Sequence, residues 1–143
     1  MYLLDTDILS ADAPTKREIA PKALASWLRA HGDHLFMSSV TVAEIEAGIA
    51  RATRIGAVTK AVRLRRWLSA VEHFYAGRIL PFGIAEARQA GAILDRARAH
   101  DPGFEDIAIA ATAAAHGFTV LTANERHFRP LGVPVINPLK RLP

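Results

Sequence analysis

Short apolar runs alternate with longer stretches of helical periodicity along the chain. Apolar runs of strand length occupy Tyr2–Leu4, His34–Met37, part of Tyr75–Phe82, Phe118–Thr122 and Val135–Ile136. Apolar residues recur at helical spacing over Ile8–Ala11, Lys22–His31, Thr41–Ala52, Ile84–Arg98 and Phe104–Ala115. Strands that alternate with helices favour right-handed connections and a parallel sheet covered on both faces. The pattern therefore predicts one α/β domain over residues 1–143, with three α/β/α layers around a short parallel sheet.

The segment Phe104–Phe128 carries the clearest local signals. Alanine and isoleucine dominate its helix, which allows close packing, and Gly117 stands where a helix C′ residue takes a positive φ. The apolar, β-branched run that follows predicts a buried strand. If this strand is parallel to the others, helix and strand deliver Asp106 and Asn124 to one edge of the sheet. Open α/β sheets bind their ligands at that edge.

Four polar side chains at helix starts or strand ends converge there, and they are Asp5, Glu44, Asp106 and Asn124. Two have a local alternative, because Asp5 could cap the helix that follows it and Glu44 fits a capping box with Thr41. Three carboxylates about 5 Å apart would repel by roughly 3 kcal/mol per pair at an effective dielectric constant of about 20. A cation removes that penalty. Oxygen ligands without cysteine or paired histidines favour Mg²⁺ or Mn²⁺ over zinc.

Composition excludes several classes of protein. The 143 residues contain no cysteine, which excludes disulfides, thiolate nucleophiles and cysteine-based zinc sites and suits a reducing compartment. No apolar run approaches the ~20 residues that cross a bilayer, and no signal-type segment precedes Asp5. We therefore expect a soluble, cytoplasmic protein without a membrane partner.

Basic residues gather from the end of the helix predicted at Thr41–Ala52 onward. Lys and Arg outnumber Asp and Glu by 18 to 14, and the net charge of +4 permits a nucleic-acid partner without requiring one. The basic stretch contains Arg51, Arg54, Lys60, Arg63, Arg65 and Arg66. It could be a solvated helix face, or Arg51 and Arg54 could steer a nucleic-acid backbone.

Four motifs in order make the chain resemble a PIN domain over essentially its whole length. They are Leu3-Leu4-Asp5-Thr6-Asp7, Ser38-Ser39-Val40-Thr41-Val42-Ala43-Glu44, Asp106-Ile107-Ala108-Ile109-Ala110-Ala111-Thr112-Ala113 and Leu121-Thr122-Ala123-Asn124. Within that superfamily the chain is most similar to VapC-type toxins of type II toxin–antitoxin systems. The segment Phe74–Phe82 and the ending Val135-Ile136-Asn137-Pro138 resemble the FitB-like branch.

The resemblance implies a Mg²⁺-dependent endoribonuclease toxin. It further implies a homodimer, and a cognate antitoxin whose tail enters the acidic pocket, with assembly into a larger complex on operator DNA. Asp5, Glu44 and Asp106 match the family's best-defined acidic positions and are the expected catalytic residues, with Asp5 and Asp106 as metal ligands. Thr6 and Thr122 match hydroxyl positions that would orient Asp5 or a metal-bound water, or else satisfy nearby backbone groups.

Three positions depart from the family pattern. Asn124 falls where a fourth acid often lies, Asp7 stands where Asn is common, and His127 stands where related toxins often have Asp. Glu105 and Glu125 are near enough in sequence to supplement the site. The loss of the fourth acid leaves open whether one or two metal ions bind.

The expected chemistry is metal-assisted hydrolysis of a phosphodiester, with Glu44 holding a water and acting as base. The choice of RNA as substrate rests on the resemblance alone. One alternative is a weakly catalytic or non-catalytic partner subunit of a DNA-binding antitoxin complex, and Asn124 is its support. A DNA nuclease is a further alternative.

Overall fold

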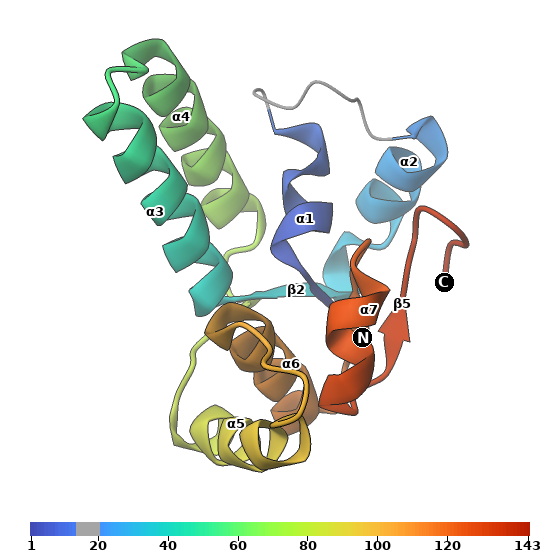
Figure 1. Ribbon diagram of the computed structural model, residues 1–143. Helices are drawn as coiled ribbons and strands as arrows, with labels where there is room; N and C mark the ends of the chain where they lie inside the picture. Colours follow the sequence, from blue (N-terminus) through green and yellow to red (C-terminus); the bar gives the residue numbers. More distant parts are fainter. Residues whose placement is uncertain (14–20) are drawn as a thin grey trace.

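Five parallel strands form the centre of the computed structural model, which describes residues 1–13 and 21–143 (Figure 1). The strands are β1 (Tyr2–Leu4), β2 (Leu35–Ser38), β3 (Ile79–Leu80), β4 (Thr119–Leu121) and β5 (Val135–Ile136). Their order across the sheet is β3-β2-β1-β4-β5, and Leu4 of the central strand pairs with Met37 and Leu121. All five strands point the same way, so their carboxyl ends share one edge.

Helices connect the strands and cover both faces of the sheet. The α-helices are α1 (Thr6–Leu9), α2 (Lys22–Ala30), α3 (Ser39–Arg54), α4 (Val58–Phe74), α5 (Ile84–Arg96), α6 (Phe104–His116) and α7 (Glu125–Phe128). Short 3-10 turns occupy Ser10–Asp12, Gly32–His34 and Arg129–Leu131. In the part of the chain that the structure describes, no helix is long and apolar enough to cross a membrane.

Neighbouring residues of one strand pack into opposite cores. Leu4 and Leu121 join one apolar cluster with residues of α1, α3 and α4, while Leu3 and Val120 join a second cluster with residues of α5 and α6. Strands buried on both faces are the hallmark of a parallel sheet between two helical layers. The predicted three-layer α/β/α fold is therefore confirmed.

Helix α3 begins at Ser39, two residues before its predicted start at Thr41. The side chain of Ser38 accepts a hydrogen bond of 3.2 Å from the backbone N–H of Val40, so Ser38 rather than Thr41 is the N-cap. Glu44 consequently lies in the second turn, beyond the reach of a capping box. That local alternative for Glu44 is wrong.

Gly117 has a φ of 67° and ends α6 in the left-handed conformation, as the sequence predicts. A second glycine, Gly48 on α3, lies one residue before the buried Ile49 but is itself exposed. It borders an open pocket instead of a packed core.

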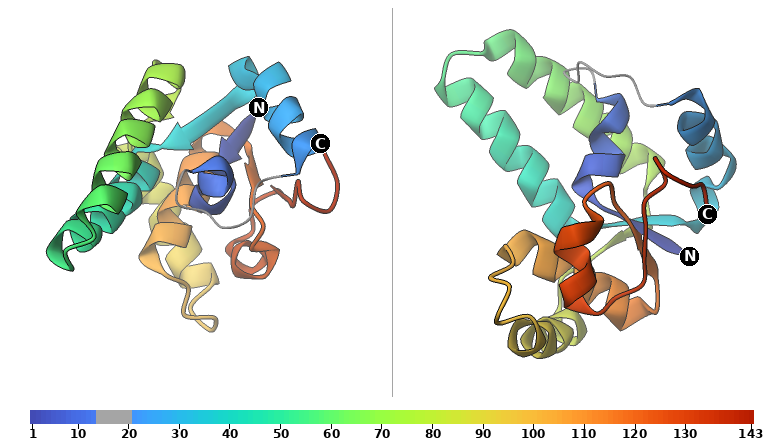
Figure 2. Two further views of the ribbon diagram at one scale, coloured as in Figure 1. Left: turned by 90° about the horizontal axis from the view of Figure 1, so that it is seen from above. Right: turned by 45° about the vertical axis from the view of Figure 1, so that its right-hand side comes forward.

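Helices α3 and α4 form an antiparallel pair that projects beyond the sheet, as Figures 1 and 2 show. The turn between them contains Gly56 at a φ of 78°. In these views only the first turns of α3 and the last turns of α4 lie against the sheet. The remaining turns of the pair extend beyond the sheet and lie beside α1.

Candidate functional site

Asp5 stands directly after β1 at the carboxyl edge of the sheet and is 7% exposed. Its Oδ1 accepts a 2.8 Å hydrogen bond from the backbone N–H of Thr6, and its Oδ2 accepts a 2.6 Å bond from the Thr122 hydroxyl. Thr122 follows β4, the strand beside β1. Asp5 therefore caps α1 and also takes part in a long-range polar cluster, so its two interpretations are not exclusive.

Glu44 reaches the same edge from α3. It is half-buried, and its Oε2 accepts a hydrogen bond from the Thr6 hydroxyl. Thr6 thus contacts both expected catalytic acids, Asp5 through its backbone and Glu44 through its side chain.

Asp106 lies in the first turn of α6 and is half-buried. Its Oδ2 lies 3.2 Å from Nδ1 of His127 in α7, a contact between residues 21 positions apart. The sequence indicated for His127 only that it stands where related toxins often have Asp. The structure places its ring beside an expected metal ligand.

The carboxylates share one electrostatic neighbourhood. Burial, then the charges of Asp7 and Asp106, raise the pKa of Asp5 to about 7, although hydrogen bonds from Thr122 and Thr6 oppose the shift. Burial also raises the pKa of Glu44, and the nearby charge of Asp106 acts in the same direction. The charge of Asp106 therefore contributes to the raised pKa of both Asp5 and Glu44, so Asp106 lies close to the other two expected acids.

Asp7 belongs to this cluster although its sequence position gave it no role. Its Oδ2 accepts hydrogen bonds of 2.9 Å from the Ala123 N–H and 3.4 Å from the Thr122 hydroxyl, and burial raises its pKa. Its Oδ1 is buried and has no hydrogen-bond partner among the described residues. A buried carboxylate oxygen without a donor is a binding position for a cation or a water. The Asp-x-Asp spacing after β1 was the available signal in the sequence.

Asn124 lies at the end of the β4 edge, half-buried, and its backbone N–H donates a 2.9 Å hydrogen bond to the Thr122 hydroxyl. Within residues 1–13 and 21–143 its side chain makes no hydrogen bond, which leaves its amide oxygen available. Buried Asn137 supports this turn by donating to the Ala123 carbonyl at 3.2 Å.

The two additional acids differ in their surroundings. Glu105 lies near enough for its charge to raise the pKa of Glu44. Glu125 instead pairs with Lys140 and lies 3.7 Å from Arg129, so its charge is already neutralised. Of these two residues, Glu105 is therefore the one that adds negative charge beside the expected catalytic acids.

The donor chemistry fits a hydrated hard cation better than a closed metal cage. Among residues 1–13 and 21–143, no three Asp, Glu or His side chains form a direct metal-binding group. Mg²⁺ demands few protein ligands, because it keeps several waters and often binds through one or two carboxylates. Carboxylates with raised pKa values and an unpartnered Asp7 oxygen are the features that such a cation would satisfy.

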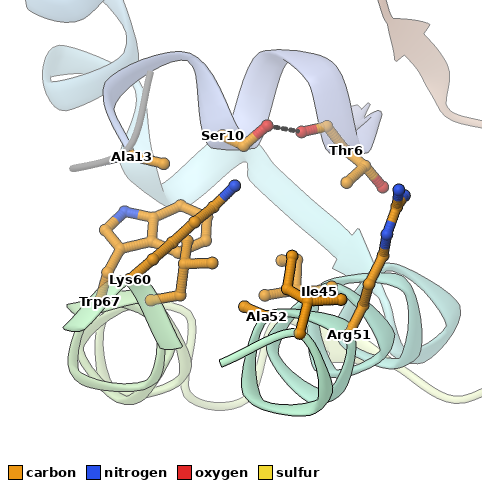
Figure 3. Close-up of a pocket in the computed structure, with 11 residues that line it drawn as sticks. Thr6, Ser10, Ala13, Ile45, Arg51, Ala52, Lys60 and Trp67 are labelled. Atoms are coloured by element: carbon orange, nitrogen blue, oxygen red, sulfur yellow. Dashed lines mark hydrogen bonds between the residues drawn. The ribbon is translucent and has the colours of Figure 1, made fainter. Parts of the chain in front are cut away.

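The two arginines expected to steer a nucleic-acid backbone occupy different places. Arg51 lines a pocket between α1, α3 and α4, and Figure 3 shows its guanidinium directed toward Thr6. Arg54 is exposed at the last position of α3 and is absent from that pocket lining. Only Arg51 is brought toward the acidic edge.

The chain is thus an α/β protein with an acidic site at the carboxyl edge of a parallel sheet. It belongs to the PIN-domain family, whose model matches residues 2–132. It is 31% identical over 141 residues to the VapC ribonuclease Y4jK of Sinorhizobium fredii, covering 96% of this chain and 97% of that protein. It is 33% identical over 144 residues to the toxin FitB of Neisseria gonorrhoeae, covering 96% and 98%.

Solved structures of similar proteins support the same family assignment. The crystal structure of FitAcB from Neisseria gonorrhoeae matches with a TM-score of 0.80 at 32% identity, covering 96% of this chain and 98% of that one. A structure of FitAB bound to an IR36 DNA fragment matches with a TM-score of 0.78 at 31% identity, covering 97% and 96%. The predicted resemblance to PIN domains, and within them to VapC and FitB toxins, is confirmed.

Proposed function

We propose that the protein is the toxin of a toxin–antitoxin pair and a Mg²⁺- or Mn²⁺-dependent endoribonuclease that hydrolyses RNA phosphodiester bonds. The observation that carries the proposal is the buried Asp5 carboxylate, whose pKa is raised to about 7 beside Asp7 and Asp106 at the carboxyl edge of the sheet. The similarity to a protein named VapC ribonuclease supports the choice of RNA. A cytoplasmic location fits such a substrate.

Asp5 and Asp106 are the residues that would hold the cation, with the free oxygen of Asp7 and the amide of Asn124 beside them. When bound, the cation supplies positive charge to the developing phosphorane-like transition state and lowers the pKa of a water. Glu44 is the proposed general base, because its raised pKa brings a carboxylate closer to the pKa that proton transfer near neutral pH requires.

The hydroxyls of Thr6 and Thr122 act as positioning groups. Thr6 donates to Glu44, and Thr122 donates to Asp5, so each hydroxyl fixes the direction of one carboxylate. His127 holds Asp106 in the same manner through its contact of 3.2 Å.

A cognate antitoxin is the proposed partner, with a basic tail that occludes the carboxylate cluster. An Arg guanidinium can pair with two carboxylate oxygens at once and would compensate the same negative charge as a metal ion. The similar structures of FitAcB and of FitAB on DNA support assembly with an antitoxin on operator DNA.

The proposed assembly state is a homodimer. On α5 the buried side is formed by Glu86, Ala90 and Ile93, and the C-cap residue Ala97 is buried as well. Ala87, Gly91 and Leu94 lie on the exposed side of the same helix. Ile84 and Phe104, 75% and 58% exposed, add apolar surface near the starts of α5 and α6. Large exposed apolar side chains are a feature of contact surfaces between subunits, and this supports the proposed homodimer.

The test is incubation of the purified protein with single-stranded RNA or with DNA of the same sequence, in Mg²⁺, in Mn²⁺ or in a chelator. We expect cleavage of RNA alone, and only with a divalent cation. Cleavage of DNA in preference to RNA would replace the proposal with a DNA nuclease. Absence of cleavage in every condition, with antitoxin binding retained, would favour a non-catalytic partner subunit.

A further inference from the structure

A pocket of about 450 Å³ lies between α1, α3 and α4, directly beside the acidic edge (Figure 3). Thr6 joins the two regions, because it lines the pocket and its hydroxyl donates a hydrogen bond to Glu44. Pockets of ~300–1,000 Å³ hold small ligands in other proteins. This volume is therefore large enough for one group of a substrate whose reacting bond lies at the acids.

The lining combines apolar side chains with polar and basic ones. Ile45, Leu64 and the half-buried Trp67 supply the apolar surface. The Ser10 hydroxyl lies on the opposite wall and donates a 2.6 Å hydrogen bond to the Thr6 carbonyl. Figure 3 shows Lys60 and Trp67 extending from α4 toward α1.

The charge of the lining is entirely positive. Arg51 and Lys60 are its charged members, and neither has an ion-pair partner among the described residues. By contrast, Arg65 on the outer side of α4 is held by Glu46 at 3.1 Å. Two unneutralised cations around an apolar pocket favour an anionic, partly apolar occupant and disfavour a basic peptide.

We propose that this pocket binds an unpaired nucleotide of the RNA substrate next to the scissile phosphate. The base would lie on Trp67 and its apolar neighbours, since aromatic side chains stack on unpaired bases. Arg51 and Lys60 would bind the adjoining phosphate. The inference rests on the proposed ribonuclease activity and adds a requirement, namely that the RNA is single-stranded beside the cleavage point.

Gly48 provides a direct way to obstruct the pocket. A Cβ built on Gly48 meets no atom within 4 Å, so a larger side chain enters the open volume without a clash. Gly48→Leu places an isobutyl group in the pocket and obstructs part of it, while Gly48→Ala removes the same helix-interior glycine and leaves most of the volume free. Both substitutions raise helix propensity, so neither is expected to unfold the protein.

The experiment measures binding without cleavage. In a chelator, the full chain carrying Trp27→Phe, which leaves Trp67 as its tryptophan, is titrated with a single-stranded oligoribonucleotide of about six nucleotides. We expect quenching of Trp67 fluorescence, and an affinity at least about tenfold lower with Gly48→Leu, corresponding to the loss of one stacked base. Gly48→Ala should bind like the parent. Arg51→Ala and Lys60→Ala should weaken binding, whereas Arg66→Ala, a matched loss of charge outside the lining, should not.

Equal RNA affinities for Gly48→Leu and Gly48→Ala would overturn the inference. Equal quenching of Trp67 fluorescence by inorganic phosphate and by RNA would also overturn it, because that result would indicate a simple anion site. Unchanged RNA affinity with loss of antitoxin binding in Gly48→Leu would assign the pocket to the antitoxin instead. Cleavage with Mg²⁺ is measured in parallel. If the wild type cleaves RNA and Gly48→Leu cleaves it with the same KM, the pocket assignment alone fails; if the wild type cleaves no RNA, the proposed activity fails.

Discussion

The Thr122 hydroxyl donates a 2.6 Å hydrogen bond to Asp5 Oδ2, across 117 positions of sequence. The same hydroxyl oxygen accepts the backbone N–H of Asn124 at 2.9 Å, so its proton is directed to Asp5. The two residues follow neighbouring strands, β1 and β4, and their contact joins the carboxyl ends of these two strands at the acidic edge. Thr122 and the backbone N–H of Thr6 therefore together fix the direction of the Asp5 carboxylate.

Thr122→Val removes this hydroxyl while keeping the shape of the side chain. A hydrogen bond to a charged group contributes ~1.5–3 kcal/mol, so we expect RNA cleavage to fall by about tenfold or more. The pKa of Asp5 should rise further, because the Thr122 hydrogen bond lowers it. Cleavage rates measured across pH should therefore shift to higher pH in Thr122→Val and remain near wild type in Thr122→Ser. An unchanged rate and pH profile in Thr122→Val would remove Thr122 from the site.

The metal-free protein should lose stability as pH rises toward neutrality. In the folded protein the pKa of Asp5 is about 7, against 3.8 for the ordinary carboxyl, so the folded state holds a proton that the unfolded chain has released. Stability then falls with rising pH between these two values. A shift of this size corresponds to at most about 4 kcal/mol at about 1.4 kcal/mol per pKa unit.

Asp5→Asn tests that expectation, because the amide cannot ionise. Urea unfolding in a chelator at several pH values should give a difference in stability, variant minus wild type, that increases in favour of the variant up to about pH 7. Above that pH the difference should be constant. A difference independent of pH would show that Asp5 has an ordinary pKa in the folded protein.

Local sequence signals were sufficient for the layers of the fold. Alternating apolar runs predicted the strands, and Gly117 fixed the end of α6 at its positive φ. The start of α3 was misplaced because the Thr41-x-x-Glu44 pattern resembles a capping box, whereas Ser38 makes the observed cap. Ser38 and Thr41 are both residue types that cap helices, so the local sequence does not distinguish between them. The position of the preceding strand determines which of the two is the N-cap.

The site was only partly predictable for the same reason. Asp5, Glu44 and Asp106 could be selected by their positions at strand ends and helix starts. The role of Asp7 depends on the Ala123 N–H, which comes from a turn 116 positions away. The contact of His127 with Asp106 likewise requires α7 to lie against the first turn of α6. Such contacts arise from tertiary structure and leave no periodic signal in the sequence.

Antitoxin and metal should compete for the carboxylate cluster. Insertion of an antitoxin Arg would neutralise the same oxygens that a cation requires. Calorimetric titration with Mg²⁺ should therefore give weaker binding in the saturated toxin–antitoxin complex than in the free toxin, together with a loss of cleavage. Full Mg²⁺ affinity and an unchanged cleavage rate in the complex would contradict occlusion of the site.

Asn124→Asp should strengthen binding of Mg²⁺ or Mn²⁺. The substitution adds a negative charge where the present amide supplies only an uncharged oxygen, and hard cations respond to ligand charge. Cleavage need not rise, because tighter binding accelerates the reaction only if the transition state gains more than the ground state. Metal titration by calorimetry measures affinity and stoichiometry. If both are unchanged in a correctly folded variant, Asn124 lies outside the metal site.

The most direct test of the account is the rate of Mg²⁺-dependent RNA cleavage by Asp5→Asn and Asp106→Asn, with Glu86→Gln as control. Glu86 is also a buried acid, but it pairs with His116 at 3.1 Å between α5 and α6, away from the acidic edge. We predict that both Asn variants fold, as judged by thermal unfolding, and show no metal-dependent cleavage, whereas Glu86→Gln retains it. A folded Asp5→Asn or Asp106→Asn protein that cleaves RNA at the wild-type rate would contradict the assignment of this cluster as the active site.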